Sequence, residues 1–324
     1  FLVLVAAGYS HRSKLRYLTC SALAAGLCIY FLPVLKYRGS LRMTVLPAGG
    51  GSILIDDQPR GERLLVDASD ERGAKMILAP FLHALGINAL DSLLLTHASV
   101  RHVGGTGVLL KDTPPKKAVT SGLRFRSIPF NAALRELDKN RIPLSLMGEN
   151  DTVGRWQVIH PAKNSKPGTA DSNPLIFRGE HGGLRLLFLS DLGWEGQKEL
   201  IARHSDELKT DLLIAGMPAR GEPLGSELLE LTAPKIIILC TSDYPASNRG
   251  SRKLRERLES RGIPIYYCDE AKAITVTVKP NQFRLEPMNG ESLEWKSEEA
   301  PKFRRRNDSA TLSITPSVDT EVDE

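Results

Sequence analysis

The stretch LLLTHASVRHVGG, residues 93–105, is the part of the chain around which the fold is organised. An apolar run of strand length ends in Thr96 and His97. A short loop then leads to a second histidine, His102, and to Gly104 and Gly105, after which a new apolar segment begins. We therefore predict that residues 91–95 form a strand that delivers His97 to a loop.

The length and composition fit a folded protein with one large domain, alone or with appendages. The 324 residues are 41% apolar and 25% charged, which is typical of a globular chain rather than a disordered one. The formal net charge of +5 permits weak binding to nucleic acid without indicating it.

Four cysteines, Cys20, Cys28, Cys240 and Cys268, are spread over the chain. None belongs to a Cys-x-x-Cys pair, so neither a cysteine zinc site nor a disulfide framework is indicated. The sequence predicts buried thiols that pack as small apolar side chains.

An apolar segment, Leu18–Leu35, carries no charged residue. As a helix it would be about 27 Å long, close to the thickness of the bilayer core. We expect residues 1–40 to be a membrane segment with a transmembrane helix at about 18–35, and a signal peptide is the alternative. Basic residues flank both sides, so the orientation is not settled. The chain begins with an apolar stretch at Phe1 rather than with Met, which suggests a fragment with channel helices upstream.

Residues 41–288 alternate strand-like and helix-like segments, which predicts an α/β domain with helices covering sheets. Its first two strands are joined by AGGG, residues 48–51. A tight hairpin turn is favoured there over a phosphate cradle, because the Lys and the following helix of a P-loop are missing. Residues 289–324 are rich in Ser, Thr, Glu and Asp and are predicted to be a disordered tail.

The stretch at residues 93–105 resembles the metal loop of the metallo-β-lactamase fold, in which a strand ends in Thr-His-x-His-x-Asp-His-x-Gly-Gly and the loop side chains hold zinc. The order of features from Leu18 to Met288 is similar to one branch of that superfamily, the C-terminal domain of the ComEC/Rec family of competence proteins, which are DNA-uptake channels. The segments that carry the resemblance are Leu65-Val66-Asp67, residues 91–97, residues 102–105, Asp171-Ser172-Asn173, residues 187–191, Tyr267-Cys268-Asp269 and Ala273-Ile274-Thr275.

This resemblance implies a metallo-β-lactamase-like αββα sandwich preceded by a transmembrane helix. It also implies a place in the bacterial plasma or inner membrane, with DNA as a partner. Four residues match positions that are structural near the family's site, namely Asp67, Thr96, Gly104 and Gly105.

The resemblance implies that His97, His102 and Asp191 occupy metal-ligand positions. Ser99 and Arg101 stand where two further ligands are expected. The distal His-His-Gly element of the family is MPARG here, residues 217–221, and the opening element at residues 46–52 lacks its acids. The departures from the family pattern therefore all lie at positions where the family's chemical groups are expected.

We predict that Arg101 and Asp191 form an ion pair in the vacated metal site, because a guanidinium pairs well with a carboxylate and repels a dication. The site would then need no cofactor, and the domain would be an inactive, hydrolase-like protein with a structural or DNA-contacting role. One alternative is a phosphodiesterase or nuclease with a single zinc on His97, His102 and Asp191. Another is a fold reused for protein binding. A triad of Ser99, His97 and Asp191 is weaker, because nothing places Ser99 on a strained elbow.

Overall fold

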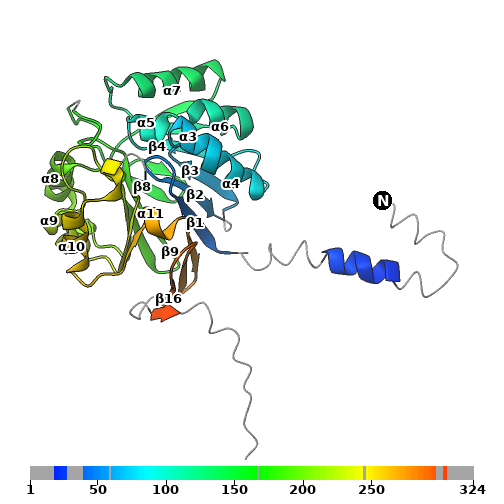
Figure 1. Cartoon of the computed structure of the whole chain (residues 1–324). Helices are drawn as coiled ribbons and strands as arrows, with labels where there is room; N and C mark the ends of the chain where they lie inside the picture. Colours follow the sequence, from blue (N-terminus) through cyan, green and yellow to red (C-terminus); the bar gives the residue numbers. More distant parts are fainter. Residues whose placement is uncertain are drawn as a thin grey trace, which may run out of the picture.

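Two β-sheets lie face to face between two sets of helices in the computed structural model, which describes residues 18–27, 39–57, 60–166, 168–243, 246–296 and 302–304 (Figure 1). The first sheet has ten strands in the order β17-β16-β15-β14-β1-β2-β3-β4-β5-β6. Its strands are β1 (Leu41–Leu46), β2 (Ser52–Asp57), β3 (Glu62–Val66), β4 (Ser92–Leu95), β5 (Ala118–Ser121), β6 (Leu144–Met147), β14 (Ile274–Lys279), β15 (Gln282–Pro287), β16 (Ser292–Lys296) and β17 (Lys302–Arg304).

The second sheet has seven strands in the order β13-β12-β11-β10-β9-β8-β7. Its strands are β7 (Thr152–Val153), β8 (Trp156–His160), β9 (Ile176–His181), β10 (Leu184–Phe188), β11 (Leu212–Ala215), β12 (Ile236–Leu239) and β13 (Ile265–Tyr267).

Helices cover the outer face of each sheet (Figure 1). Over the first sheet lie α3 (Glu71–Gly73), η1 (Ala74–Leu78), α4 (Ala79–Ala84), α5 (Val100–Val103), α6 (Thr106–Asp112) and α7 (Ile128–Lys139). Over the second lie α8 (Trp194–His204), α9 (Ser226–Thr232) and α10 (Arg252–Glu259). Short helical turns elsewhere are η2 (Ser205–Glu207), η3 (Ala246–Arg249) and α11 (Cys268–Ala271).

Three apolar layers hold these elements together. Side chains alternate along a strand, so neighbouring residues enter different layers. Val66 of β3 and Phe188 of β10 enter the core between the sheets. Leu65 faces the helices over the first sheet, and Leu187 faces the helices over the second. The predicted αββα sandwich is therefore confirmed.

The parallel strands place the candidate site. β3, β4, β5 and β6 are parallel neighbours in the first sheet, and β10, β11, β12 and β13 are parallel neighbours in the second. The C-terminal ends of parallel strands lie at one edge of a sheet, so the loops that follow them share that edge. We call the edge formed by the loops after β4, β5, β10 and β11 the loop edge.

The helical segment that follows β3 begins at Glu71. Asp70 caps it, because its Oδ1 accepts a hydrogen bond from Gly73 N at 2.6 Å. The segment continues through η1 and α4 and ends before Gly86, which has φ +68° as a left-handed C-terminal glycine should.

Residues 18–27 form a helix, and the rest of the predicted transmembrane segment, residues 28–35, lies outside the described residues. None of the helices in the described part of the chain has the length and apolar run that crossing a bilayer needs.

The first sheet continues beyond Met288, where the sequence predicts the boundary of the domain. β16 follows it and pairs antiparallel with β15. Leu293 and Trp295 of β16 are buried in the core between the sheets, and the Trp295 ring packs on Phe283 at 5.3 Å between centroids. The charged residues that alternate with them gave this segment the composition of a tail. Residues 305–324 lie outside the described part of the chain.

Candidate functional site

Asp67 fixes the end of β4. β3 and β4 are parallel with Val66 opposite Leu94, so Asp67 and Thr96 lie beside each other just beyond the two strands. Asp67 Oδ1 accepts from Thr96 N at 2.7 Å, and Asp67 Oδ2 accepts from Thr96 Oγ1 at 2.6 Å. Thr96 Oγ1 in turn lies 2.8 Å from Ser190 Oγ, and since Thr96 donates to Asp67, Ser190 donates here. These bonds join the loop edges of the two sheets.

His102 is held over Asp67 by the short helix α5. Its Nδ1 lies 2.7 Å from Asp67 Oδ2, and its backbone oxygen accepts from Ala68 N at 2.8 Å. The turn at residues 48–51 lies against the other side of the ring. A Cβ on Gly50 would lie 2.2 Å from His102 Nε2, and one on Gly105 would lie 2.1 Å from the oxygen of Ala68. Only glycine permits both approaches.

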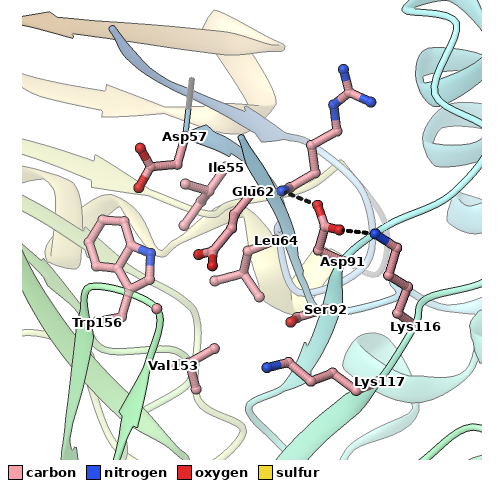
Figure 2. A pocket seen from close by; sticks show the side chains of 12 residues that line it. Ile55, Asp57, Glu62, Leu64, Asp91, Ser92, Lys116, Lys117, Val153 and Trp156 are labelled. Carbon is pink, nitrogen blue, oxygen red and sulfur yellow. Dashed lines mark hydrogen bonds and ion pairs between the residues drawn. The ribbon is translucent and has the colours of Figure 1, made fainter. Parts of the chain in front are cut away.

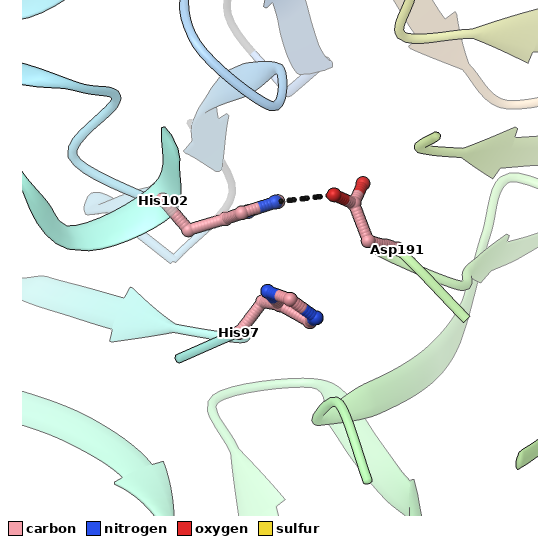
Figure 3. Close-up of side chains that lie close together, drawn as sticks. All are labelled: His97, His102 and Asp191. Carbon is pink, nitrogen blue, oxygen red and sulfur yellow. Dashed lines mark ion pairs between the residues drawn. The ribbon is translucent and has the colours of Figure 1, made fainter. Parts of the chain in front are cut away.

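Asp191 comes from the second sheet and is completely buried. Its Oδ2 forms an ion pair with His102 Nε2 at 3.0 Å. Figure 3 shows His97 and His102, from the first sheet, facing Asp191 across a shared space. The ligand atoms of these three side chains all lie within 4.8 Å of one another, so the group could hold a metal ion.

The guanidinium of Arg101 enters the same space. Its Nη2 donates to Asp191 Oδ2 at 2.7 Å and to the oxygen of Met217 at 2.8 Å, and its Nη1 donates to Asn248 Oδ1. The predicted ion pair between Arg101 and Asp191 therefore forms. Met217 begins the segment MPARG, residues 217–221, which contributes this backbone oxygen to the site.

The charges of the site reinforce one another. Burial alone would lower the pKa of His102, but the negative charges of Asp191 and Asp67 outweigh it and raise that pKa to about 10. Burial raises the pKa of Asp191, but the positive charges of His102 and Arg101 bring it below its ordinary value. His102 is therefore an imidazolium at neutral pH, with a proton on each ring nitrogen.

His97 is engaged at both ring nitrogens. Its Nδ1 accepts from Ser99 N at 3.2 Å, so in the neutral ring Nε2 carries the proton. Nε2 lies 3.1 Å from Asp171 Oδ1 and donates to it. Asp171 Oδ2 accepts from Arg220 N at 2.8 Å. The backbone N–H of Ser99 makes the contact with His97, and the buried Ser99 Oγ makes no hydrogen bond among the described residues. The Ser99 triad, which was the weaker alternative, is therefore not assembled.

Sequence reasoning missed two side chains of this site. Asp171 lies in a segment that carried the resemblance, but nothing in its local pattern shows that it contacts His97. Asn248 belongs to a loop with no recognisable motif, and it reaches Arg101 only because η3 folds back over the site. Both contacts are long-range, so the spacing of residues along the chain does not encode them.

A second cavity, of about 300 Å³, lies near the beginnings of β3, β4 and β5, at the edge of the first sheet away from the loop edge (Figure 2). Trp156, Leu64 and Val153 line it, and no histidine or cysteine does. Of the acids that line it, Asp57 is paired with Arg155 and Asp91 is paired with Lys116. This cavity is therefore separate from the candidate ligand group.

Two curated proteins resemble the chain in sequence. ComE operon protein 3 of Bacillus subtilis (strain 168) is 24% identical over 242 residues, and competence protein ComA of Neisseria gonorrhoeae is 23% identical over 235 residues. The chain resembles the competence proteins. The aligned parts cover 74% and 72% of this chain but 30% and 31% of the two relatives, so the chain spans about a third of their length. No family model matches the chain.

Solved structures of metal-dependent enzymes superpose loosely. CmlA, a diiron beta-hydroxylase from Streptomyces venezuelae, has a TM-score of 0.47 and 12% identity and covers 74% of this chain and 54% of its own. Igni18, a metallo hydrolase from Ignicoccus hospitalis, has a TM-score of 0.47 and 12% identity, with 74% of this chain and 99% of its own covered. Both TM-scores lie below 0.5.

Proposed function

We propose that this chain is a metallo-β-lactamase-like domain of a DNA-uptake competence protein, in which an arginine takes the place of the metal and which contacts DNA without hydrolysing it. The observation that carries the proposal is the position of Arg101, whose Nη2 lies 2.7 Å from Asp191 Oδ2 in a buried site. The similarity to two competence proteins supports the role in DNA uptake.

The donor set does not fit a tightly held metal ion. A catalytic zinc needs about three protein ligands with free lone pairs. His102 is held between two carboxylates, with Nδ1 at Asp67 and Nε2 at Asp191, and both nitrogens of His97 already have partners in the protein. Arg101 adds a fixed charge, and two unit charges about 4 Å apart repel by about 4 kcal/mol at an effective dielectric constant of about 20. A dication would feel about twice that repulsion, so the site favours the guanidinium.

The loop edge carries charges that suit a nucleic acid. Arg124 and Arg126 follow β5, Lys166 precedes β9 and Arg220 follows β11; all four are exposed, and among the described residues no acidic partner contacts their side chains. Trp194, at the start of α8, is 56% exposed on the same edge. Trp194 and Arg220 line one hollow of about 190 Å³. Asp171 and Glu195 also line this hollow, and Lys198 Nζ lies 4.9 Å from the centre of the Trp194 ring. Exposed aromatic rings together with cations are the groups that bind single-stranded nucleic acid.

The test of the chemistry is a nuclease assay on single-stranded and double-stranded DNA, with added zinc or manganese and with a chelator. We expect no hydrolysis above background under any of these conditions. Chelator-sensitive hydrolysis that is lost in Asp191→Asn would overturn the proposal.

The test of DNA contact is binding of a labelled single strand over a range of salt concentrations. The triple variant Arg124→Ala, Arg126→Ala, Arg220→Ala should reduce the slope of log K against log salt by about 2, since each phosphate contact to a single strand contributes about 0.7. Trp194→Ala should weaken binding by about 1–3 kcal/mol through lost base stacking. The matched control, Lys117→Ala, Lys139→Ala, Lys209→Ala, removes three exposed cations that precede β5, β6 and β11 at the opposite edge, and it should bind like the original chain. Equal losses in both triple variants would contradict the assignment.

A second candidate is a hydrolase with a single metal. Two observations favour it: the ligand atoms of His97, His102 and Asp191 lie within 4.8 Å of one another, and the buried Asp191 Oδ1 has no hydrogen-bond partner among the described residues. These residues would hold the ion, which would supply a polarised water. The nuclease assay separates this candidate from the first.

Anchoring in a bacterial membrane through residues 18–35 also stays a proposal, supported by the apolar sequence of that segment.

A further inference from the structure

The ends of β12 and β13 bring two cysteines together. The parallel register pairs Ile238 with Tyr266 and Leu239 with Tyr267. One residue further along each strand stand Cys240 and Cys268. Beyond them the two chains stay in contact, because Thr241 Oγ1 donates to Asp269 Oδ1 at 2.5 Å and accepts from Asp269 N at 3.2 Å. The two cysteines are therefore neighbours just past the paired ends of β12 and β13, where Cys268 begins α11.

Both side chains also point to the same layer. Cys240 and Cys268 lie in the core between the sheets, 5% and 0% exposed, and both thiols are free. Neighbouring strands are about 4.8 Å apart, which lies within the range of about 4.4–6.8 Å between Cα atoms that a disulfide spans. The Cys268 thiol hydrogen-bonds to that of Cys240 and, together with burial, raises the pKa of Cys240. The neighbouring strand ends and the shared layer therefore favour a cross-link between the two cysteines.

We propose that Cys240 and Cys268 are a built-in cross-link site, and that they form a disulfide between the ends of β12 and β13 when the chain folds in the presence of an oxidised thiol. The Cys240 thiolate attacks one sulfur of oxidised glutathione and releases one glutathione thiolate. The Cys268 thiolate then attacks the Cys240 sulfur of the mixed disulfide and releases the second. One molecule of oxidised glutathione is thereby reduced to two molecules of glutathione thiol, and the two cysteine protons pass to the released thiolates.

The cross-link bears on the candidate site. Cys240 lines a cavity of about 20 Å³ together with His102, Ser190 and Gly216. A Cβ on Gly51 would lie 2.5 Å from Cys240 Sγ, so the turn at residues 48–51 packs on this cysteine as well as on His102. A disulfide between Cys240 and Cys268 would therefore hold in place the residue on which the turn at residues 48–51 packs. Because the folded thiols are buried, exchange after folding should be slow, and the bond should form during folding.

The test is to refold the full chain in buffers of oxidised and reduced glutathione, alkylate it in denaturant and map the peptides by mass spectrometry. The variant Cys20→Ser, Cys28→Ser removes the other two cysteines of the chain. We expect this variant to lose both titratable thiols in the oxidising buffer, to lose the mass of two hydrogen atoms, and to yield a linked peptide with Cys240 and Cys268. Its Tm should rise by several degrees, and dithiothreitol should reverse the change.

A further Cys268→Ser substitution in that variant should leave Cys240 unlinked within the chain and abolish the rise in Tm. If Cys240 and Cys268 are both alkylated in the original chain after refolding in the oxidising buffer, the proposal is overturned. The mapping needs no variant, so a substitution that fails to fold does not affect this outcome. Neither result depends on DNA binding or on metal content.

Discussion

At the scale of single residues, Arg101 determines the character of the site. A buried carboxylate such as Asp191 must be matched by positive charge, and either a metal ion or a protein cation can supply it. Here the guanidinium of Arg101 supplies this positive charge, and it donates hydrogen bonds to three acceptors: Asp191, the Met217 oxygen and Asn248. His102 supplies a second positive charge from the other side.

Removing Arg101 should therefore destabilise the fold. Arg101→Ala leaves Asp191 buried with one cation fewer, and we expect the free energy of unfolding to fall by about 3 kcal/mol. Urea denaturation measures it. The control is Arg252→Ala, which removes an arginine whose side chain is 92% exposed and should change stability by less than about 0.5 kcal/mol. Equal effects of the two substitutions would show that the Arg101 pair contributes nothing.

The sequence predicts those residues of the site that belong to a local motif. Thr96, His97 and His102 stand in one stretch, and Asp191 ends a recognisable apolar strand. Asp171 could not be predicted as the partner of His97. The two residues are 74 positions apart, and their contact depends on how the loop that carries Asp171 folds back over β4.

At the scale of elements, charged side chains also fix how strands begin. Asp211 stands just before β11, and its Oδ2 accepts from the backbone N and the Nε of Arg185 in β10, both at 3.0 Å. Lys235, next to β12, lies 3.2 Å from its Oδ1. Asp211 thus joins three neighbouring strands of the second sheet at the edge away from the loop edge.

This cluster predicts a pH dependence of stability. Burial raises the pKa of Asp211, but the hydrogen bonds and charge of Arg185 bring it below the ordinary 3.8. A carboxyl with a depressed folded pKa contributes stability above its unfolded pKa and loses it as the pH falls through the folded value. Asp211→Asn should therefore cost about 2 kcal/mol near pH 7, and the difference from the original chain should shrink below pH 4. Chemical denaturation across pH 2–7 checks this, and a difference that stays constant would refute it.

The last strands test where the domain ends. Trp295→Ala should lower the free energy of unfolding by about 3–5 kcal/mol, because the indole is buried between the sheets. Lys296→Ala, at an exposed position of the same strand, should change it by less than about 0.5 kcal/mol. If Trp295→Ala were as mild as its control, β16 would not belong to the core.

Most elements were predictable because their apolar periods are strong. The parallel strands β4, β11 and β12 are continuous apolar runs, and α7 and α10 have capping serines at Ser127 and Ser251. β16 was not predictable, since three polar or charged residues alternate with Leu293 and Trp295 in a segment of tail-like composition. Which strands join which sheet was implied only by the resemblance, because register depends on contacts far apart in sequence.

At the scale of the whole molecule, the sandwich brings the ends of two parallel strand sets together at the loop edge. One set contributes Asp67, His97, Arg101 and His102, and the other contributes Asp191. The framework that would assemble a metal centre is kept, with Thr96 and Ser190 joining the sheets. Within this framework Arg101 and His102 supply positive charge to Asp191.

The most direct test of this account is the metal content of the purified chain. Elemental analysis should be made after equilibration with excess zinc and gel filtration, on the original chain and on Arg101→Asp, Ser99→His, which restores acidic and imidazole ligands in the loop. The account predicts well under one zinc per original chain and a clear gain in the double variant. Near-stoichiometric zinc in the original chain would contradict the claim that Arg101 has replaced the metal.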